Sequence, residues 1–145
     1  MKIITATGTA IVIILGLCAW SDRSHPITHQ NLKALSNMHI KLSSPKAKPK
    51  LTPQQAREIT DNMSPYDATE AKQVFVEYQL VTDTATEVPH FGFLHRVPCY
   101  IVSYEGLHLP SHQSTPGGPT APGHTEVNFV IDANTGQPLV SFDYR

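Results

Sequence analysis

The sequence predicts an α+β fold, in which an N-terminal helix packs on a small antiparallel sheet of three to four strands that ends in a β-hairpin. Two observations predict this fold class. A well-marked helix start stands at residues 51–59, and segments with the pattern of strands follow it towards the C-terminus. This order is typical of a helix laid across an antiparallel sheet. Residues 51–145 are long enough to bury one modest core.

The helix is expected to begin after Thr52, which is a favourable N-cap residue and is followed by Pro53 at the first helical position. Gln55 is placed to complete a capping box with Thr52. A second helix start follows at Ser64-Pro65. We therefore expect either one kinked helix or two short helices over residues 52–72.

Four segments are expected to be strands, namely residues 73–82, 96–104, 126–133 and 138–144. In the first and third of these, apolar and polar residues alternate, which is typical of a strand with one buried face. The second is apolar on both faces, and Pro98 indicates a strand start or a sheet edge there. Together these segments predict the antiparallel sheet.

A tight turn between the last two segments predicts a C-terminal β-hairpin. Gly136 can take the positive φ that such a turn requires, and Asn134 is a common turn residue. Asp132, just before the turn, is interpreted as a turn residue whose carboxylate accepts backbone N–H groups.

Residues 1–20 have the pattern of a signal peptide or a membrane anchor. Lys2 is followed by a stretch without charged side chains from Ile3 to Trp20, as in a secretory signal. The same stretch is close to the shortest length that spans a bilayer, with Lys2 on the inner side. A third alternative is lipidation at Cys18, because Leu15-Gly16-Leu17-Cys18 resembles a bacterial lipobox. All three place residues 21–145 outside the cytoplasm, either secreted or tethered to the outer face of the membrane.

Residues 21–50 are expected to form a flexible tether between the export segment and the domain at 51–145. Their end, Lys46-Ala47-Lys48-Pro49-Lys50, is rich in lysine and proline and should be extended and solvated. Weak helical spacing is present in residues 31–42, but no strand is expected there.

Residues 106–125 form a long Pro/Gly/His-rich loop, and loops of this length in small domains are often functional or disordered. Imidazoles in and near the loop could ligate zinc or copper, although solvated loop histidines are the simpler explanation. The weak candidate ligands are His90, His95, His108, His112 and His124.

Composition and motifs argue against several other functions. The net charge of −1 offers no field to hold a polyanion, so nucleic-acid binding is not expected. Two cysteines exclude a disulfide-rich scaffold. Cys99 lies in an apolar run and is interpreted as a core residue, with catalysis by its thiol as the less favoured alternative. Since the sequence contains none of the common catalytic motifs, we do not expect an enzyme.

Three segments resemble PepSY domains. Residues 130–139, with Asp-Ala followed by Asn-Thr-Gly between two apolar strands, are similar to the closing signature of that family. Residues 51–56 resemble the opening of its helix, and residues 96–104 resemble its middle strand. The resemblance covers residues 51–145, with the loop at 106–125 as an insertion.

PepSY domains are non-catalytic, and they occur in propeptides of secreted metallopeptidases and in exported bacterial proteins. The resemblance therefore implies a non-catalytic module without a cofactor. It implies that the domain engages or restrains an extracytoplasmic peptidase or another envelope protein. The expected contact is either the loop at 106–125 or the strand bearing Pro98. The alternative is an extracytoplasmic zinc- or copper-binding protein that uses the histidines named above.

Overall fold

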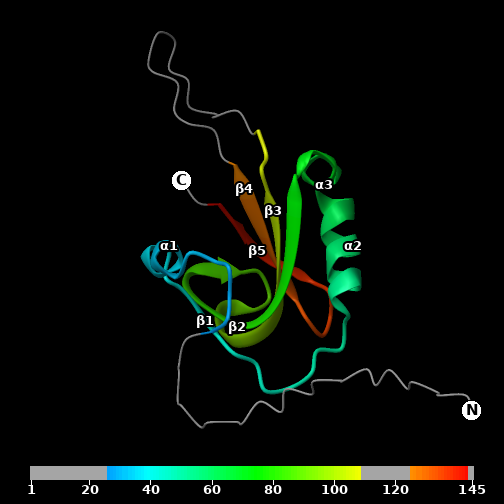
Figure 1. Cartoon of the computed structure of the whole chain (residues 1–145). Coiled ribbons are helices and arrows are strands. Elements are labelled where there is room, and N and C mark those ends of the chain that lie inside the picture. The colour runs from blue at the N-terminus through cyan, green and yellow to red at the C-terminus, as the bar shows by residue number, and fades with distance from the viewer. Residues whose placement is uncertain (1–25, 109–124, 144–145) are drawn as a thin grey trace, which may run out of the picture.

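The computed structural model describes residues 26–108 and 125–143, in which three helices accompany one five-stranded sheet (Figure 1). In chain order the elements are α1 (Leu32–Asn37), β1 (Ile40–Ser43), α2 (Pro53–Met63), α3 (Pro65–Glu70), β2 (Gln73–Val88), β3 (Gly92–Glu105), β4 (Glu126–Asp132) and β5 (Pro138–Phe142). All neighbouring strands are antiparallel, and their order in the sheet is their order in the chain.

This arrangement is of the α+β class, but two details of the predicted fold are wrong. The sheet has five strands rather than three to four, because β1 adds to the edge of β2. The predicted helix is also not N-terminal, since α1 and β1 precede it. The four expected strands are present as β2 to β5.

The helix start lies where the capping pattern predicts it. The Thr52 hydroxyl accepts a hydrogen bond from Gln55 N at 3.2 Å, and Gln55 Oε1 accepts one from Thr52 N at 2.9 Å. The helix α2 ends at Met63, and α3 begins at Pro65. A proline cannot continue a helix without losing a backbone hydrogen bond, so the segment divides into two short helices.

The β2–β3 hairpin is longer than expected. Residues 84–87 are exposed and continue β2 beyond residue 82, although they lack the alternation that identifies a half-buried strand. The turn that follows is formed at His90 and Gly92, which both have positive φ, of 68° and 69°. Because β3 pairs with β2 on one side and β4 on the other, Pro98 does not lie in an edge strand, contrary to the prediction.

The C-terminal hairpin is formed by β4 and β5. Asp132 Oδ1 accepts hydrogen bonds from Asn134 N at 2.8 Å and from Thr135 N at 2.9 Å. Gly136 has a φ of 77°, and its N–H donates to the carbonyl of Asp132 at 2.9 Å. The carboxylate before the turn therefore replaces backbone acceptors that the reversing chain cannot supply.

The sheet buries apolar side chains on both faces. The helices α2 and α3 cover one face, where Ala56 packs on Tyr100 and Tyr104 (Figure 1). Tyr104 Oη is 2.6 Å from both Thr60 Oγ1 and Asp61 Oδ1, which anchors α2 to β3. The opposite face carries the second core. This core consists of Leu35, Ile40, Leu42, Val81, Val88, Leu94, Cys99, Ile101, Val130, Leu139 and Phe142.

The second core includes residues from the segment expected to be a tether. Asn31 caps α1, whose Leu35 is completely buried. Ile40 and Leu42 of β1 point into the same core, and β1 pairs with residues 80–83 of β2. Residues 26–43 are therefore part of the folded unit rather than a solvated spacer.

Candidate functional site

The sheet face away from α2 becomes polar towards one end. Along β3, Cys99 and Ile101 are in the core, whereas Ser103 and Glu105 follow on the same face because side chains alternate along a strand. Ser103 lies opposite Asn128 of β4, and Glu105 lies opposite Glu126. A core face thus continues into a row of polar side chains.

Residues 26–31 lie over this row and are joined to it by hydrogen bonds. Gln79 Nε2 donates to the carbonyl of Ile27 at 2.9 Å. The buried amide of Gln30 donates to Ser103 Oγ at 2.8 Å and to Asn128 Oδ1 at 3.2 Å. Ser103 Oγ in turn donates to Asn128 Oδ1. Because Gln30, Ser103 and Asn128 are all buried, this network fixes the position of the segment on the sheet.

The imidazole of His29 is held in one orientation by two neighbours from β2. Its Nδ1 lies 2.5 Å from Glu77 Oε1, and its backbone N–H donates to the same oxygen at 2.8 Å. Its ring lies against Phe75, with the centroids 4.4 Å apart and an angle of 31° between the planes. The other ring nitrogen, Nε2, is therefore directed towards β3 and β4.

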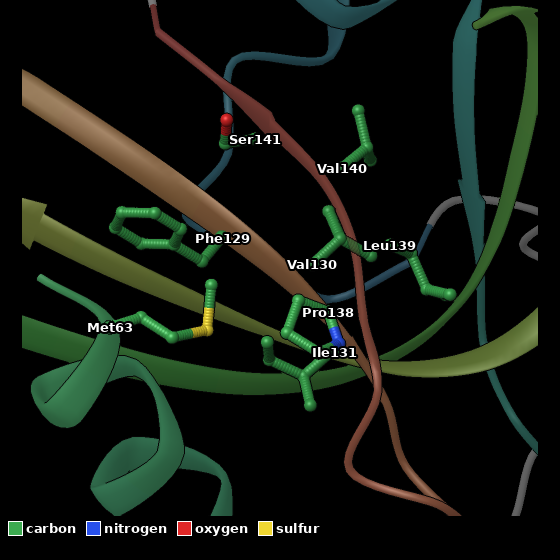
Figure 2. A pocket seen from close by; sticks show the side chains of 8 residues that line it. All are labelled: Met63, Phe129, Val130, Ile131, Pro138, Leu139, Val140 and Ser141. Atoms are coloured by element: carbon green, nitrogen blue, oxygen red, sulfur yellow. The ribbon is translucent and has the colours of Figure 1, made fainter. Parts of the chain in front are cut away.

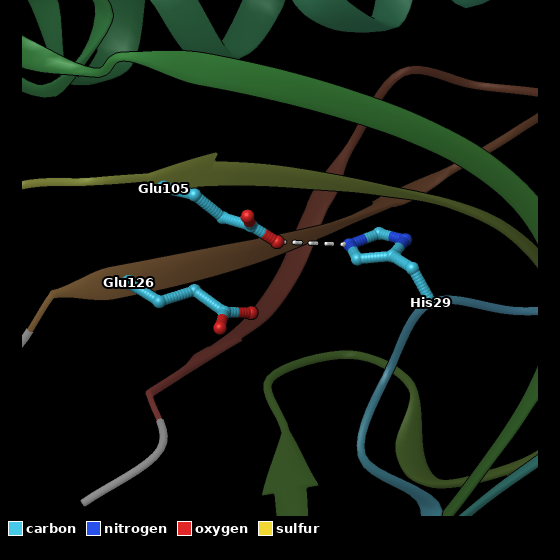
Figure 3. A group of neighbouring side chains, drawn as sticks. All are labelled: His29, Glu105 and Glu126. Carbon is cyan, nitrogen blue, oxygen red and sulfur yellow. Dashed lines mark ion pairs between the residues drawn. The ribbon is translucent and has the colours of Figure 1, made fainter.

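Two carboxylates face this second nitrogen (Figure 3). His29 Nε2 is 3.6 Å from Glu105 Oε1, and Glu126 extends from β4 towards the same place (Figure 3). One ligand-type atom from each of His29, Glu105 and Glu126 lies within 4.8 Å of the others. Together with Glu77, these residues are called the His29 cluster below.

Burial raises the pKa of the Glu126 carboxyl above its ordinary value, and the adjacent carboxylate of Glu105 raises it further. The hydrogen bond from Asn128 Nδ2 to Glu126 Oε1, 2.9 Å long, and the imidazole of His29 lower the pKa, but burial outweighs them. The carboxyl of Glu126 therefore takes up a proton more readily than an exposed glutamate does.

Chemically, the His29 cluster can do two things. The Glu77 carboxylate and the His29 imidazole fasten residues 26–31 to the sheet. An imidazole nitrogen beside two carboxylates is also a donor set that divalent metal ions use in proteins.

The histidines proposed from the sequence as metal ligands do not belong to this cluster. His90 lies in the β2–β3 turn, His95 lies in β3 and His108 follows β3, and all three are exposed. Among residues 26–108 and 125–143, the group of three ligand-type side chains that the structure brings together contains none of them. His112 and His124 lie outside the described residues.

Cys99 is a core residue in the structure. Its side chain is completely buried, and burial together with the nearby Asp132 raises the pKa of the thiol to about 12. A nucleophilic cysteine requires a thiolate near neutral pH. The environment of Cys99 therefore opposes catalysis by this residue.

A separate pocket of about 190 Å³ lies beside β5, the last strand of the sheet (Figure 2). Met63 at the end of α2 borders it and is 46% exposed. The rest of its lining comes from β4 and β5, namely Phe129, Val130, Ile131, Pro138, Leu139, Val140 and Ser141.

The sequence analysis missed the residues of the His29 cluster. The sequence does contain a signal for them, which is polar residues on the face of a strand that is otherwise buried. Glu77 follows this pattern in β2, and Ser103 and Glu105 follow it in β3. Polar residues in such positions indicate a covered or functional surface. The sequence pattern does not show which strands pair or in which register, so it could not predict that Glu105 lies opposite Glu126.

Comparison with models of known protein families, with curated proteins and with solved structures gives no match. The residues expected to form the export segment, 1–20 with Cys18, lie outside the described part of the chain. Within residues 26–108 and 125–143, every helix is too short or too polar to cross a membrane.

Proposed function

We propose that this chain is an exported, non-catalytic binding module of the PepSY type that engages and restrains an extracytoplasmic peptidase. The observation that supports this function best is the position of β5 at the end of the described sheet, beside an apolar pocket (Figure 2). An extended segment of the peptidase would add to this edge as a sixth strand and place an apolar side chain in the pocket.

The edge of β5 has the chemistry that this binding mode requires. A strand at the end of a sheet has an outer row of backbone N–H and C=O groups, and an extended chain is the partner that pairs with such a row. The pocket beside it, with half-exposed Met63 and Val140 and exposed Pro138, adds the apolar surface that contributes affinity.

The export pattern of residues 1–20 and the hairpin signature at residues 130–139 support the cellular location and the family in this proposal. A module on the outer side of the membrane meets secreted peptidases, and such domains are associated with peptidase restraint. A tethered form would act on membrane neighbours, whereas a released form would find its target by diffusion.

The test is stoichiometric inhibition of a purified secreted peptidase from the same host. We expect an equimolar amount of the chain to slow hydrolysis of a peptide substrate and to form a complex that survives gel filtration. Unchanged hydrolysis, together with the absence of a complex, would contradict the proposed function.

Two exposed apolar residues of the helices provide a matched pair of variants. Met63→Lys places a charge in the pocket, whereas Tyr66→Lys places it on α3, where Tyr66 is 56% exposed and outside the pocket lining. We expect the first substitution to weaken inhibition about 10-fold or more, because a charge entering an apolar contact loses its hydration. The second should leave inhibition unchanged.

An extracytoplasmic metal-binding protein is the second candidate. The observation that favours it is the His29 cluster rather than the histidines at positions 90–124.

A further inference from the structure

We propose that His29, Glu105 and Glu126 form a binding site for a divalent transition-metal ion, with Zn²⁺ as the probe, and that the ion fastens residues 26–31 to β3 and β4. This site is independent of the peptidase-binding edge, since the two share no residues.

The separations between the donor atoms are close to those of a metal site. Ligand atoms at about 2.1 Å from a tetrahedral zinc ion are about 3.4 Å apart. His29 Nε2 and Glu105 Oε1 are already 3.6 Å apart, and the whole group of three lies within 4.8 Å. Small rotations of the two glutamate side chains, which are only half-buried, would close the remaining gap.

The hydrogen bond between His29 and Glu77 favours the tautomer and the ring orientation in which Nε2 can bind a metal ion. A metal-bound histidine commonly donates its other ring N–H to a carboxylate, which fixes the tautomer and the ring orientation. Glu77 occupies that position, with Oε1 at 2.5 Å from Nδ1, and Thr28 Oγ1 donates to the other oxygen of the same carboxylate. With the proton on Nδ1, the lone pair of Nε2 is directed at Glu105 and Glu126.

The amide of Gln30 is compatible with metal binding at Nε2. Its Nε2 lies 3.1 Å from His29 Nε2, 2.8 Å from Ser103 Oγ and 3.2 Å from Asn128 Oδ1. A side-chain amide has two N–H groups, so three acceptors exceed its capacity. If a metal ion takes the lone pair of His29, the two N–H groups still satisfy Ser103 and Asn128.

The charge around the site favours a cation. Three carboxylates from adjacent strands, Glu77, Glu105 and Glu126, surround one imidazole. Among the described residues, the ion pairs of Glu77 and Glu105 are both with His29. The ion pair of Arg57 is with Asp61 on α2 and adds no positive charge to the site. A divalent ion would compensate the excess negative charge in a partly dehydrated place, where like charges repel strongly.

The mixed donor set indicates the class of metal. Imidazole suits zinc and other first-row transition metals, whereas sites for Mg²⁺ and Ca²⁺ use oxygen ligands throughout. One nitrogen and two carboxylates therefore favour zinc over the alkaline earth ions. Water would complete the coordination.

The experiment measures zinc binding to the full chain, purified without a histidine tag, by competition with a chromophoric chelator and by equilibrium dialysis. We expect one equivalent of zinc per chain and no comparable binding of Mg²⁺ or Ca²⁺. In a separate sample, Co²⁺ should give the absorption of a site with nitrogen and oxygen ligands and no thiolate band, because the proposed site contains no cysteine.

Two conservative variants remove one ligand each. Glu126→Gln keeps an oxygen to accept the hydrogen bond from Asn128, and His29→Asn keeps a polar group near the position of Nδ1 while lacking Nε2. We expect each to weaken zinc binding about 10- to 100-fold. Circular dichroism and urea unfolding in the presence of EDTA verify that the variants are folded.

Two controls separate this site from the histidines that the sequence suggested as metal ligands. His90→Asn changes an exposed turn residue and should leave zinc binding unchanged. The double substitution His112→Asn and His124→Asn should also have no effect. Absence of zinc binding by the wild-type chain would overturn the proposal. So would zinc binding that is lost in the loop variant but retained by folded His29→Asn and Glu126→Gln.

Discussion

The imidazole of His29 and the carboxylate of Glu77 are 48 residues apart in the sequence, yet Nδ1 and Oε1 lie 2.5 Å apart. The same carboxylate accepts hydrogen bonds from His29 N and Thr28 Oγ1. Glu77 therefore binds two consecutive residues of a segment that precedes every helix of the described chain. This contact links the N-terminal segment to β2 and places His29 beside Glu105.

Glu77→Ala is expected to lower the free energy of unfolding by about 1–2 kcal/mol, because it removes hydrogen bonds to a charged acceptor. The value stays in this range because the side chain of Glu77 is still 17% exposed and water screens part of the interaction. Urea unfolding at neutral pH measures the change. Glu87→Ala is the matched control on the exposed part of β2 and should change stability by less than about 0.5 kcal/mol. Equal effects of the two substitutions would contradict the anchoring role of Glu77.

Leu35→Ala tests whether α1 is an integral part of the fold. Leu35 is completely buried in the second core, and its truncation leaves a cavity, so we expect a loss of about 2–5 kcal/mol in urea unfolding. Leu32→Ala on the same helix is the control, because Leu32 is 37% exposed. If residues 26–43 were a detached spacer, both substitutions would leave stability unchanged.

Gly136→Ala is expected to destabilise the chain more than Gly92→Ala, although both glycines have positive φ, of 77° and 69°. The shared backbone strain costs about 1–2 kcal/mol in each case. At Gly136 an added Cβ would also lie 2.9 Å from Ile59 Cδ1, whereas at Gly92 it would meet nothing within 4 Å. Thermal unfolding of the two variants separates crowding from strain. A larger loss at Gly92 would show that the contact of the turn with α2 is unimportant.

The buried thiol of Cys99 should make the fold sensitive to alkali. In the unfolded chain the thiol ionises near pH 9, but in the folded chain its pKa is raised to about 12. Above pH 9 the folded state therefore binds more protons than the unfolded state, and its stability falls by up to about 1.4 kcal/mol per pH unit. The stability that the folded state owes to the protonated thiol is fully present below pH 9 and is lost as the pH rises towards about 12.

Urea unfolding as a function of pH measures this loss, with Cys99→Ala as the comparison. The variant should be less stable at neutral pH because of the cavity, but its stability should fall less steeply above pH 9. Parallel curves for the two proteins would contradict the prediction. In native protein the peptide that contains Cys99 should also remain unmodified by a thiol reagent.

Local signals in the sequence were accurate where neighbouring residues determine the conformation. Thr52 and Gln55 cap α2 through bonds that span three residues, and these were predicted correctly. The end of the β2–β3 hairpin was missed, because residues 84–87 are exposed and their side chains carry no alternation. β1 was also missed, because it has only four residues. Its two apolar residues, Ile40 and Leu42, are too few to show the alternation of a strand.

The candidate site depends on contacts that local signals cannot encode. Gln30 and Asn128 bond across 98 positions, and His29 and Glu77 across 48. Which glutamates become neighbours depends on the strand register, which places Glu105 opposite Glu126. A shift of one residue would direct one of the two side chains to the other face of the sheet.

By itself, the sequence determined the start of α2, the turn after Asp132 and the α+β class, because capping bonds, turn chemistry and alternation act within a few residues. The tertiary structure alone decided that residues 26–43 belong to the domain, that Pro98 lies in a central strand and that His29 meets three glutamates. The physical reason is that segments distant in the sequence are brought together by the pairing of whole strands and the burial of two cores. Both depend on the complete chain rather than on any one stretch of it.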